Sequence, residues 1–472
     1  MKILLTGATG YIGKRLLPAL IEQGHHVVCC VRDKNRFNPP SSLLQSIDII
    51  EVDFLDIDSL EALPKDIEGA FYLMHSMSTS SDYQSLEKLS ASNFKAAISH
   101  TNCNHVVYLS GIINDNELSK HLASRKMVEN ELARDSYALT TLRAGIIIGS
   151  GSASFEIIRD LVEKLPAMIT PKWLNTKCQP IGIQDVITFL TKTIFKKETY
   201  NQNFDIGGPD ILTYKEMLLG YAKVRGLKRT ILTLPVMTPK LSSYWLYFVT
   251  STSYKLAIAL VNSMKVEVVC RDRRINDIIG IETIPYLEAL ERTLQKVVSN
   301  QVVSSWKDSL VSGRFDHNIS EHLIVPSFGC YKDHRSSEFE DLKSCKSKIW
   351  SIGGDTGWYY ANWLWKLRGF MDKLSGGVGL RRGRTNLEEI NSGDTVDFWR
   401  VLYSNKKEGR LLLFAEMKLP GEAWLEFKIC EKKLLQTATF RPKGLWGRIY
   451  WYSVLPFHGA IFNGMLLNLS KK

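Results

Sequence analysis

The sequence predicts an α/β protein: a Rossmann-like, doubly wound parallel sheet with a small substrate lobe, followed by a separate α+β domain. Three observations lead to this class. The first 34 residues read as strand, glycine-rich turn, helix and strand. Strand-like and helix-like stretches then alternate as far as residue 143, which is typical of parallel sheets. After residue 300 the chain becomes rich in tryptophan, and its strand-like runs follow one another directly.

The glycine-rich turn follows a predicted buried strand, 2–5, and opens an amphipathic helix, 14–23. Gly7 permits a tight turn, Gly10 lets a pyrophosphate approach the backbone, and Gly13 allows close packing of helix and strand. The helix N-terminus offers N–H groups and a positive dipole end to phosphates. We therefore expect a dinucleotide along this turn, although a ligand-free glycine turn would have the same pattern. The predicted cofactor-binding residues here are Gly7, Thr9, Gly10, Tyr11, Ile12 and Gly13.

Periodicity places the other elements of the first 300 residues. Strands are predicted at 26–31, 47–53, 69–75, 105–109, 139–143, 179–183 and 203–209. Helices are predicted at 58–63, 83–99, 118–135, 155–165, 184–195, 213–224, 242–264 and 284–298. The helix at 213–224 begins with Thr213 and Glu216, which have the spacing of a capping box.

Length and composition set the domain organisation. A chain of 472 residues with 44% apolar and 23% charged residues suggests two or three globular domains. We place the boundary in a polar stretch near residue 300, giving an NAD(P)-binding Rossmann domain at 1–300 and a tryptophan-rich α+β domain at 301–472. The chain begins with a structural strand instead of a signal sequence, so we expect a cytoplasmic protein whose eight cysteines are reduced thiols. No metal-binding spacing of Cys and His is present.

The charge is concentrated in the second domain. Of the net charge of +11, +8 lies after residue 300, where 26 Lys and Arg face 18 Asp and Glu. Such a surface could meet an anionic ligand or a membrane, or be an ordinary solvated surface. Nucleic-acid-binding motifs are missing from the sequence, so we expect no nucleic-acid partner.

The second domain is predicted to be an antiparallel meander with helices. Nine of the eleven tryptophans lie in it, and 358–374 has the pattern of an aromatic helix. Alternating apolar runs predict strands at 395–403, 410–418, 423–429 and 434–440, and 447–469 predicts a long apolar C-terminal helix. This order suggests a helix-grip-like fold. The polar residues of the last helix favour packing under the sheet over membrane contact.

The end of the second strand bears on the choice of cofactor. An acidic residue about twenty positions beyond the glycine turn would hydrogen-bond a ribose, whereas Arg32 suits a 2′-phosphate. We therefore expect NADP(H) in preference to NAD(H). The alternative is that Arg32 is solvated and Asp33 holds the ribose. At the ends of the third and fourth strands, Asp53, Phe54 and Met74 are further candidates for cofactor contact.

Several stretches together resemble the atypical and extended short-chain dehydrogenases/reductases, including their NmrA-like and epimerase-like members: 6–13, 108–111, 142–145, 180–186 and 205–209. The resemblance covers roughly residues 1–300 and implies a Rossmann sheet with a C-terminal substrate lobe. A second set resembles an uncharacterised domain fused to some bacterial members: 357–360, 376–384, 397–400, 421–426, 447–452 and 455–458. That domain brings no established chemistry.

The resemblance also implies a catalytic serine, tyrosine and lysine, and the chain departs from this pattern. Ser110 matches the strand-end serine approximately, but the Tyr-x-x-Ser-Lys segment begins with His121 and ends with Arg125. Arg125 could hold ribose hydroxyls or an oxyanion, and His121 could donate a proton or be an exposed helix-start residue. His75, just past the fourth strand, is the other candidate. Lys126 should point about 100° away from Arg125 on the helix.

We therefore expect an NADP(H)-dependent oxidoreductase acting on a small apolar or carbonyl-containing substrate. The competing interpretation is a non-catalytic NAD(P)H sensor or scaffold, which the missing Tyr/Lys pair favours. A lipid-associated reductase is a third possibility. The substrate and the oligomeric state are left open by the sequence.

Overall fold

The computed structural model divides the chain into two compact units, Met1–Val311 and Ser312–Lys472. It describes residues 1–34, 37, 39, 41–74, 83–114, 120–133, 136–150, 152–234, 264–298, 325, 330–374, 377, 379–380, 390–391 and 394–471. The predicted helix at 242–264 and the domain boundary near residue 300 fall almost wholly outside these residues.

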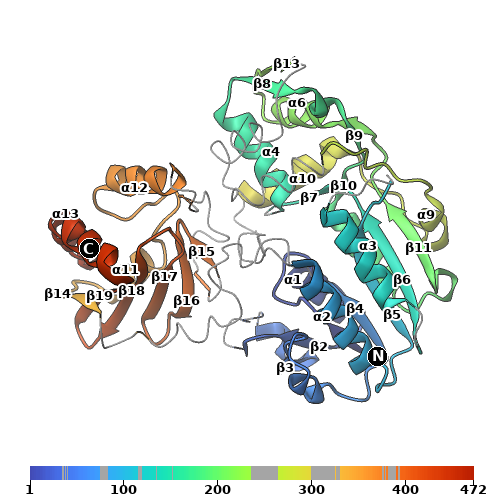
Figure 1. The fold of residues 1–472 in the computed structure, drawn as a ribbon, viewed down its shortest axis with the longest axis horizontal. Coiled ribbons are helices and arrows are strands. Elements are labelled where there is room, and N and C mark those ends of the chain that lie inside the picture. The colour runs from blue at the N-terminus through green and yellow to red at the C-terminus, as the bar shows by residue number, and fades with distance from the viewer. Residues whose placement is uncertain are drawn as a thin grey trace. The chain divides into compact units, whose positions relative to one another are not determined.

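The first unit is built on a seven-stranded, wholly parallel sheet (Figure 1). In spatial order its strands are β11 (Gln202–Ile206), β6 (Ala138–Ala144), β5 (His105–Gly111), β4 (Gly69–Tyr72), β1 (Lys2–Leu5), β2 (His26–Val31) and β3 (Ile47–Glu51). The order reverses between β1 and β4, so the carboxyl ends of these two strands frame the crevice where ligands bind in such sheets. The predicted doubly wound fold is confirmed.

Helices cover both faces of this sheet. One face packs against α1 (Gly13–Glu22), α5 (Ile183–Thr193) and α9 (Arg274–Ile279). The other packs against α2 (Tyr83–Ile98), α3 (Lys120–Leu132) and the 3-10 helix η3 (Asp58–Ala62). Residues of β1, β2, β4 and β5 are almost wholly buried, which explains their largely apolar sequences, whereas the edge strand β3 exposes Asp48 and Glu51. The predicted helix at 58–63 is present as a 3-10 helix over Asp58–Ala62, a form that is common in short segments.

A lobe with its own core completes the first unit. Helices α4 (Ala153–Lys164), α6 (Tyr214–Val224) and α10 (Tyr286–Val298) surround this core. Short strand pairs join them: β7 (Ile147–Ile148) with β10 (Ile181–Gly182), β9 (Lys177–Cys178) with β12 (Leu212–Thr213), and β8 (Ala167–Pro171) with β13 (Thr230–Leu234). The predicted capping box is present, since Thr213 accepts from Glu216 N and the Glu216 carboxylate accepts from Thr213 N.

The second unit is a six-stranded antiparallel sheet with a long helix against it; the prediction of an antiparallel sheet with a C-terminal helix is confirmed, although only four strands were expected. Its strands, in spatial order, are β14 (Tyr331–Glu338), β19 (Lys433–Pro442), β18 (Gly421–Cys430), β17 (Arg410–Ala415), β16 (Trp399–Asn405) and β15 (Thr395–Val396). The helices are α11 (Leu342–Ile349), α12 (Asn362–Leu374) and α13 (Gly444–Ser470). In the part of the chain that the structure describes, no helix has both the length and the apolar character needed to span a bilayer.

Several details of the second unit differ from the prediction, and helix α11 was not predicted. The run at 395–403 is two strands, because the backbone of Asp397 turns at a φ of +54°. The helix expected from residue 358 starts at Asn362, because Tyr359 and Ala361 have positive φ. Strand β14 was not predicted, since this edge strand is polar and leaves every second residue half-buried.

Candidate cofactor and active site

The glycine turn lies at the carboxyl end of β1, and two of its glycines are required by the fold itself. Gly7 has a φ of +65°, and a Cβ there would lie 2.9 Å from the Leu73 carbonyl oxygen. A Cβ on Gly13 would lie 2.2 Å from the Gly7 carbonyl oxygen. Gly10 differs, because its Cβ would meet only the Gly7 oxygen, at 3.1 Å. The space beside Gly10 is therefore open on the side away from the turn, where a pyrophosphate would need to approach.

The N-terminus of α1 is free of the usual capping groups. Ile12 occupies the N-cap position without a side-chain hydrogen bond, and the first turn contains no acidic residue. The N–H groups of Lys14 and Arg15 donate to Gly10 O at 3.1 Å and to Ile12 O at 3.0 Å, so an anion at this helix start would have to meet N–H groups of the residues before them. Thr6 fixes the turn against β4, since its hydroxyl donates to Phe71 O at 3.0 Å and accepts from Leu73 N at 3.0 Å.

The Tyr11 side chain faces the protein. The Arg15 guanidinium lies 4.2 Å from the centre of the Tyr11 ring and donates to Ser150 O at 2.7 Å. Burial raises the pKa of Tyr11 to about 12, against the opposing effects of Arg15 and of a hydrogen bond with Ser152. Tyr11 therefore anchors α1 to the segment at 149–152, and only its backbone is left to contribute to a phosphate site.

The predicted adenosine-side residues also follow strand ends at this edge. Arg32 is exposed directly after β2, whereas the adjacent Asp33 is buried. The Asp53 carboxylate accepts from Leu55 N at 3.1 Å and so stabilises its own turn. Phe54 is a core residue, only 3% exposed, with its ring 5.7 Å from that of Phe94.

Met74 is half-buried just beyond β4, and its sulfur accepts a long contact from the Ser90 hydroxyl at 3.9 Å. Because all these strands are parallel, Met74, Arg32 and the glycine turn lie at one edge of the sheet. The structure thus gathers the predicted cofactor residues along this edge, with the Phe54 ring turned into the core.

Two of the four candidate catalytic residues come together at the end of β5. Arg125 on α3 donates from Nη1 to Leu109 O at 3.0 Å, which brings its guanidinium beside Ser110. Ser110 is buried, and burial raises the pKa of the neighbouring Tyr108 against the opposing effects of the Arg125 charge and of Ser110. The Tyr108 hydroxyl donates to Arg125 O at 3.5 Å. Arg125 Nε is buried and meets no acceptor within the described residues.

The other two candidates cannot be placed. His75 lies outside the described residues. His121 belongs to α3, four positions before Arg125, but its side chain is likewise outside the description. No cluster of metal-binding side chains occurs in the described part of the chain.

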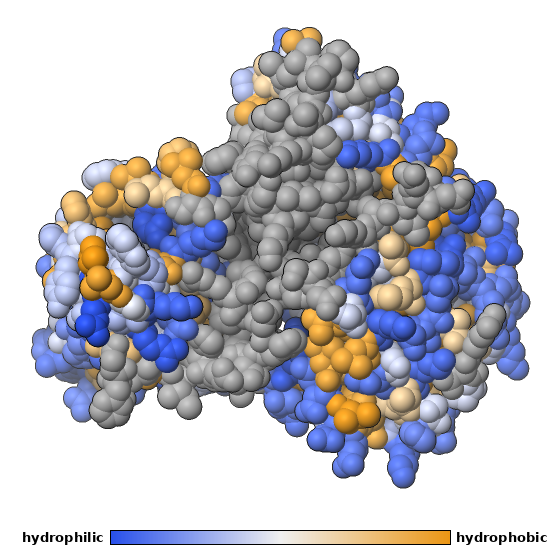
Figure 2. All heavy atoms as spheres, viewed as in Figure 1, coloured by the Kyte–Doolittle hydropathy of each residue, from blue (hydrophilic) through white to orange (hydrophobic). Residues whose placement is uncertain are grey.

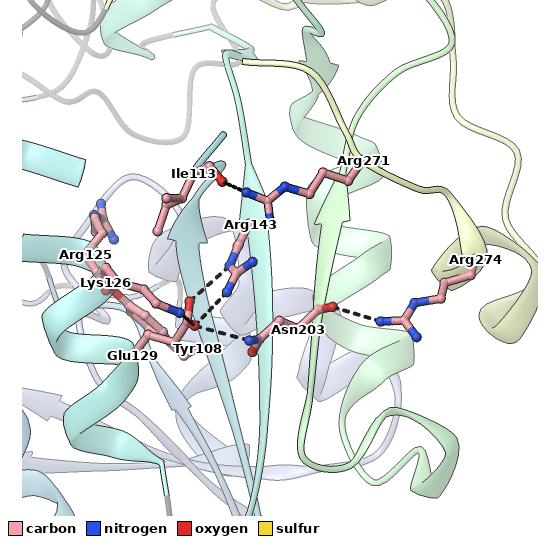
Figure 3. A network of polar contacts seen from close by, with 9 residues as sticks. All are labelled: Tyr108, Ile113, Arg125, Lys126, Glu129, Arg143, Asn203, Arg271 and Arg274. Carbon is pink, nitrogen blue, oxygen red and sulfur yellow. Dashed lines mark hydrogen bonds and ion pairs between the residues drawn. The ribbon is translucent and has the colours of Figure 1, made fainter. Parts of the chain in front are cut away.

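A buried ion network, which sequence reasoning missed, sets the orientation of α3 (Figure 3). Glu129, 3% exposed, accepts from Arg143 at 3.0 and 2.6 Å, from Lys126 at 2.7 Å and from Asn203 at 3.2 Å. The network ties α3 to β6 and β11, and Figure 3 shows Lys126 and Arg125 pointing in different directions from the helix. Lys126 is thus engaged away from β5, as expected. The signal in the sequence that could have indicated this network is Arg143, a charged residue within the buried strand β6.

A second arginine joins the lobe to the end of β5 (Figure 3). Arg271 donates from its guanidinium to Ile113 O and, at 3.2 Å, to the side-chain oxygen of Asn114. Its backbone N–H donates to Asp205 at 3.0 Å. These contacts hold the segment after residue 264 against the loop that follows β5, beside the Ser110 and Arg125 pair.

Comparisons with known proteins agree with this architecture. Residues 1–242 match the NmrA-like family, and residues 330–465 match a family described as a protein of unknown function, DUF2867. The divinyl chlorophyllide a 8-vinyl-reductase of Arabidopsis thaliana, a chloroplastic protein, is 24% identical over 254 residues, or 50% of this chain and 60% of that one. The chain thus spans somewhat over half the length of this relative. The photosystem II assembly factor Ycf39 of Trieres chinensis is 23% identical over 52% of this chain and 75% of its own.

Among solved structures, the triphenylmethane reductase of Citrobacter sp. superimposes with a TM-score of 0.51 at 16% identity, covering 62% of this chain and all of that one. A nucleoside-diphosphate-sugar epimerase of Staphylococcus aureus gives the same TM-score and coverage at 14% identity. At these identities the likeness is one of fold. The family match spans more than half of the sequence, so the chain belongs to the NmrA-like family of NAD(P)-binding Rossmann proteins related to the atypical short-chain dehydrogenases/reductases.

Proposed function

We propose that this protein is an NADP(H)-dependent reductase that acts on a small apolar or carbonyl-containing substrate. The carrying observation is that one sheet edge combines an uncapped helix start beside Gly10 with the Ser110 and Arg125 pair at the end of β5. The first can hold a pyrophosphate and the second can face the reacting end of an extended dinucleotide. The plant relatives named as reductases support the same reaction class.

In this proposal the backbone of the glycine turn and the start of α1 bind the pyrophosphate, and Arg32 binds the 2′-phosphate. The bound nicotinamide supplies the hydride. The buried Nε of Arg125 is an unused donor beside Ser110, suited to a ribose hydroxyl or to an oxyanion that develops on the substrate. Arginine keeps its charge throughout the neutral range, so Arg125 orients and stabilises without transferring a proton.

The proposal is tested by titrating the full chain with NADPH and NADH and by following NADPH oxidation across a panel of carbonyl and conjugated apolar acceptors. We expect tighter binding of NADPH and turnover with at least one class of acceptor. In Arg125→Met we expect turnover to fall by roughly 10²-fold or more, as for other lost oxyanion donors, with Arg125→Lys intermediate. Unchanged turnover in Arg125→Met would refute the role given to this residue.

A second function, a nucleotide-binding sensor or scaffold, is favoured by two observations. The tyrosine and lysine positions of the short-chain dehydrogenases hold His121 and Arg125, and one relative is named as an assembly factor. Tight NADPH binding without oxidation of NADPH across the whole panel would support this function in place of the reductase.

A further inference from the structure

The second unit exposes an apolar stripe along α12. It consists of Trp363, Leu367, Phe370, Met371 and Leu374, which are 66%, 46%, 55%, 53% and 61% exposed. At 100° per residue these side chains fall within an arc of about 100°. The opposite side of the helix packs inward through Trp365, Gly369 and Asp372. Figure 2 shows hydrophobic residues gathered over α12 at the upper left of the view. We call these five residues the α12 stripe.

On α12 itself, the charged residues that flank the stripe are basic, and one of them, Arg368, also donates to Lys418 O at 3.4 Å. Lys366 and Lys373 lie about 40–60° beyond one edge of the arc, and Arg368 lies about 60° beyond the other. Asp372 is the sole acidic residue of the helix, and it is 1% exposed and bonded to the backbone N–H groups of Gly379 and Lys418. Long basic side chains at the margins of an apolar helix face are the pattern of helices that lie in a membrane interface.

The first half of α13 repeats this chemistry. Leu445, Trp446, Ile449, Tyr452 and Phe457 are 72%, 77%, 49%, 62% and 62% exposed. No Asp or Glu occurs in the 27 residues of this helix, while Arg448 lies exposed among the apolar side chains and Lys443 precedes them. We call the five apolar residues the α13 cluster.

The two helices are packed together, so both apolar surfaces belong to one rigid unit. The Trp365 and Phe462 rings lie 6.0 Å apart, and Asn468 donates to Tyr359 O at 3.0 Å. Gly464 is required by this packing, because a Cβ there would lie 2.4 Å from the Tyr360 ring.

We propose that the α12 stripe and the α13 cluster dock the protein onto the surface of an anionic lipid bilayer. Apolar side chains would enter the boundary between headgroups and acyl chains, with Trp and Tyr at the interface and the flanking Lys and Arg on the headgroups. The charge supports this choice, because residues 301–472 carry a net +8 and both apolar surfaces lack exposed acidic neighbours on their own helices. Docking is peripheral, since no helix of the described residues is long and apolar enough to span a bilayer.

The test is co-sedimentation of the full chain with phosphatidylcholine vesicles that contain or lack phosphatidylglycerol. We expect binding to the anionic vesicles that weakens as salt is raised. Leu367→Glu/Leu374→Glu should reduce partitioning at least tenfold, and Lys366→Ala by about fivefold, the effect of one basic residue at an anionic surface. The matched control is Leu219→Glu/Leu232→Glu in the first unit, where the two leucines are 38% and 61% exposed. This control variant should bind the anionic vesicles as the wild type does.

Two further measurements keep the proposal falsifiable. Thermal unfolding of Leu367→Glu/Leu374→Glu should match the wild type, because both side chains are already exposed. Wild-type protein that ignores anionic vesicles, or a double variant that still sediments with them, would overturn the proposal. So would sedimentation velocity showing a dimer that the double variant dissociates, since the surface would then be an interface between two copies of this chain.

Discussion

Two substitutions in the glycine turn, Gly13→Ala and Gly10→Ala, should distinguish an effect on folding from an effect on ligand binding. In Gly13→Ala the new methyl carbon would sit 2.2 Å from the Gly7 oxygen and 2.9 Å from the Ala8 Cα, both backbone atoms that cannot rotate away. In Gly10→Ala it would meet only the Gly7 oxygen, at 3.1 Å. The first change should therefore damage the fold, and the second should mainly fill the space that a pyrophosphate needs.

The magnitudes follow from these contacts. Forcing a methyl group into a packed site costs about 1–3 kcal/mol, which for a domain of this size lowers the melting temperature by roughly 2–4 °C per kcal/mol. Gly13→Ala should show this loss. Gly10→Ala should melt within roughly 2–4 °C of the wild type, yet bind NADPH at least about tenfold more weakly, equivalent to about 1.4 kcal/mol.

The assay is NADPH titration by fluorescence together with thermal unfolding of the same preparations. Gly24→Ala is the control, because Gly24 has a φ of +82° but no atom within 4 Å of the added carbon. It should lose about 1–2 kcal/mol of stability through backbone strain and keep its affinity for NADPH. Wild-type affinity in a folded Gly10→Ala protein would show that the turn does not hold a dinucleotide.

Three other predictions concern charge. Arg32→Glu should reverse the preference of NADPH over NADH in parallel titrations, and an unchanged preference would exclude the 2′-phosphate contact. Glu416→Gln breaks the fully buried pair with Arg400, whose Nη2 lies 2.9 Å away, and should cost the second unit about 3–5 kcal/mol in urea unfolding; a loss below about 1 kcal/mol would contradict this. Burial lowers the pKa of His105 from 6.5 to about 4, so as the pH falls the unfolded chain takes up a proton before the folded chain does. The contribution of neutral His105 to the free energy of unfolding is therefore fully present above pH 6.5, and about 3 kcal/mol of it is lost as the pH drops to 4. His105→Phe should flatten that pH dependence.

The sheet of the first unit was predictable because its signals are local. A strand buried on both faces must be apolar throughout, so β1 and β2 were located to the residue, and the polar stop at Arg32 ended the second. The second unit was harder at two points. Asp397 has a positive φ, which Asp adopts more readily than most residues, but its apolar neighbours predicted one continuous strand. Strand β14 is held by pairing with β19 and not by burial, and its residues read as a polar loop.

The candidate site likewise has features with local sequence signals and features without them. Glycine spacing reports the local demands of a turn, and Gly7 and Gly13 meet those demands as predicted. The orientation of α3 is a non-local property. It depends on Glu129 meeting Arg143, a residue from the following strand, and sequence spacing carries no information about that encounter. The pairing of Arg125 with Leu109 O could not be derived for the same reason.

The substitution at position 125 bears directly on what the site can do. Glu129 draws Lys126 away from β5, which leaves Arg125 as the cation beside Ser110. A lysine at that place would be able to exchange its proton with a neighbouring acid, whereas the guanidinium remains charged and offers a planar set of donors. If Arg125 acts as proposed, it stabilises negative charge that develops on the substrate and leaves any proton transfer to another group.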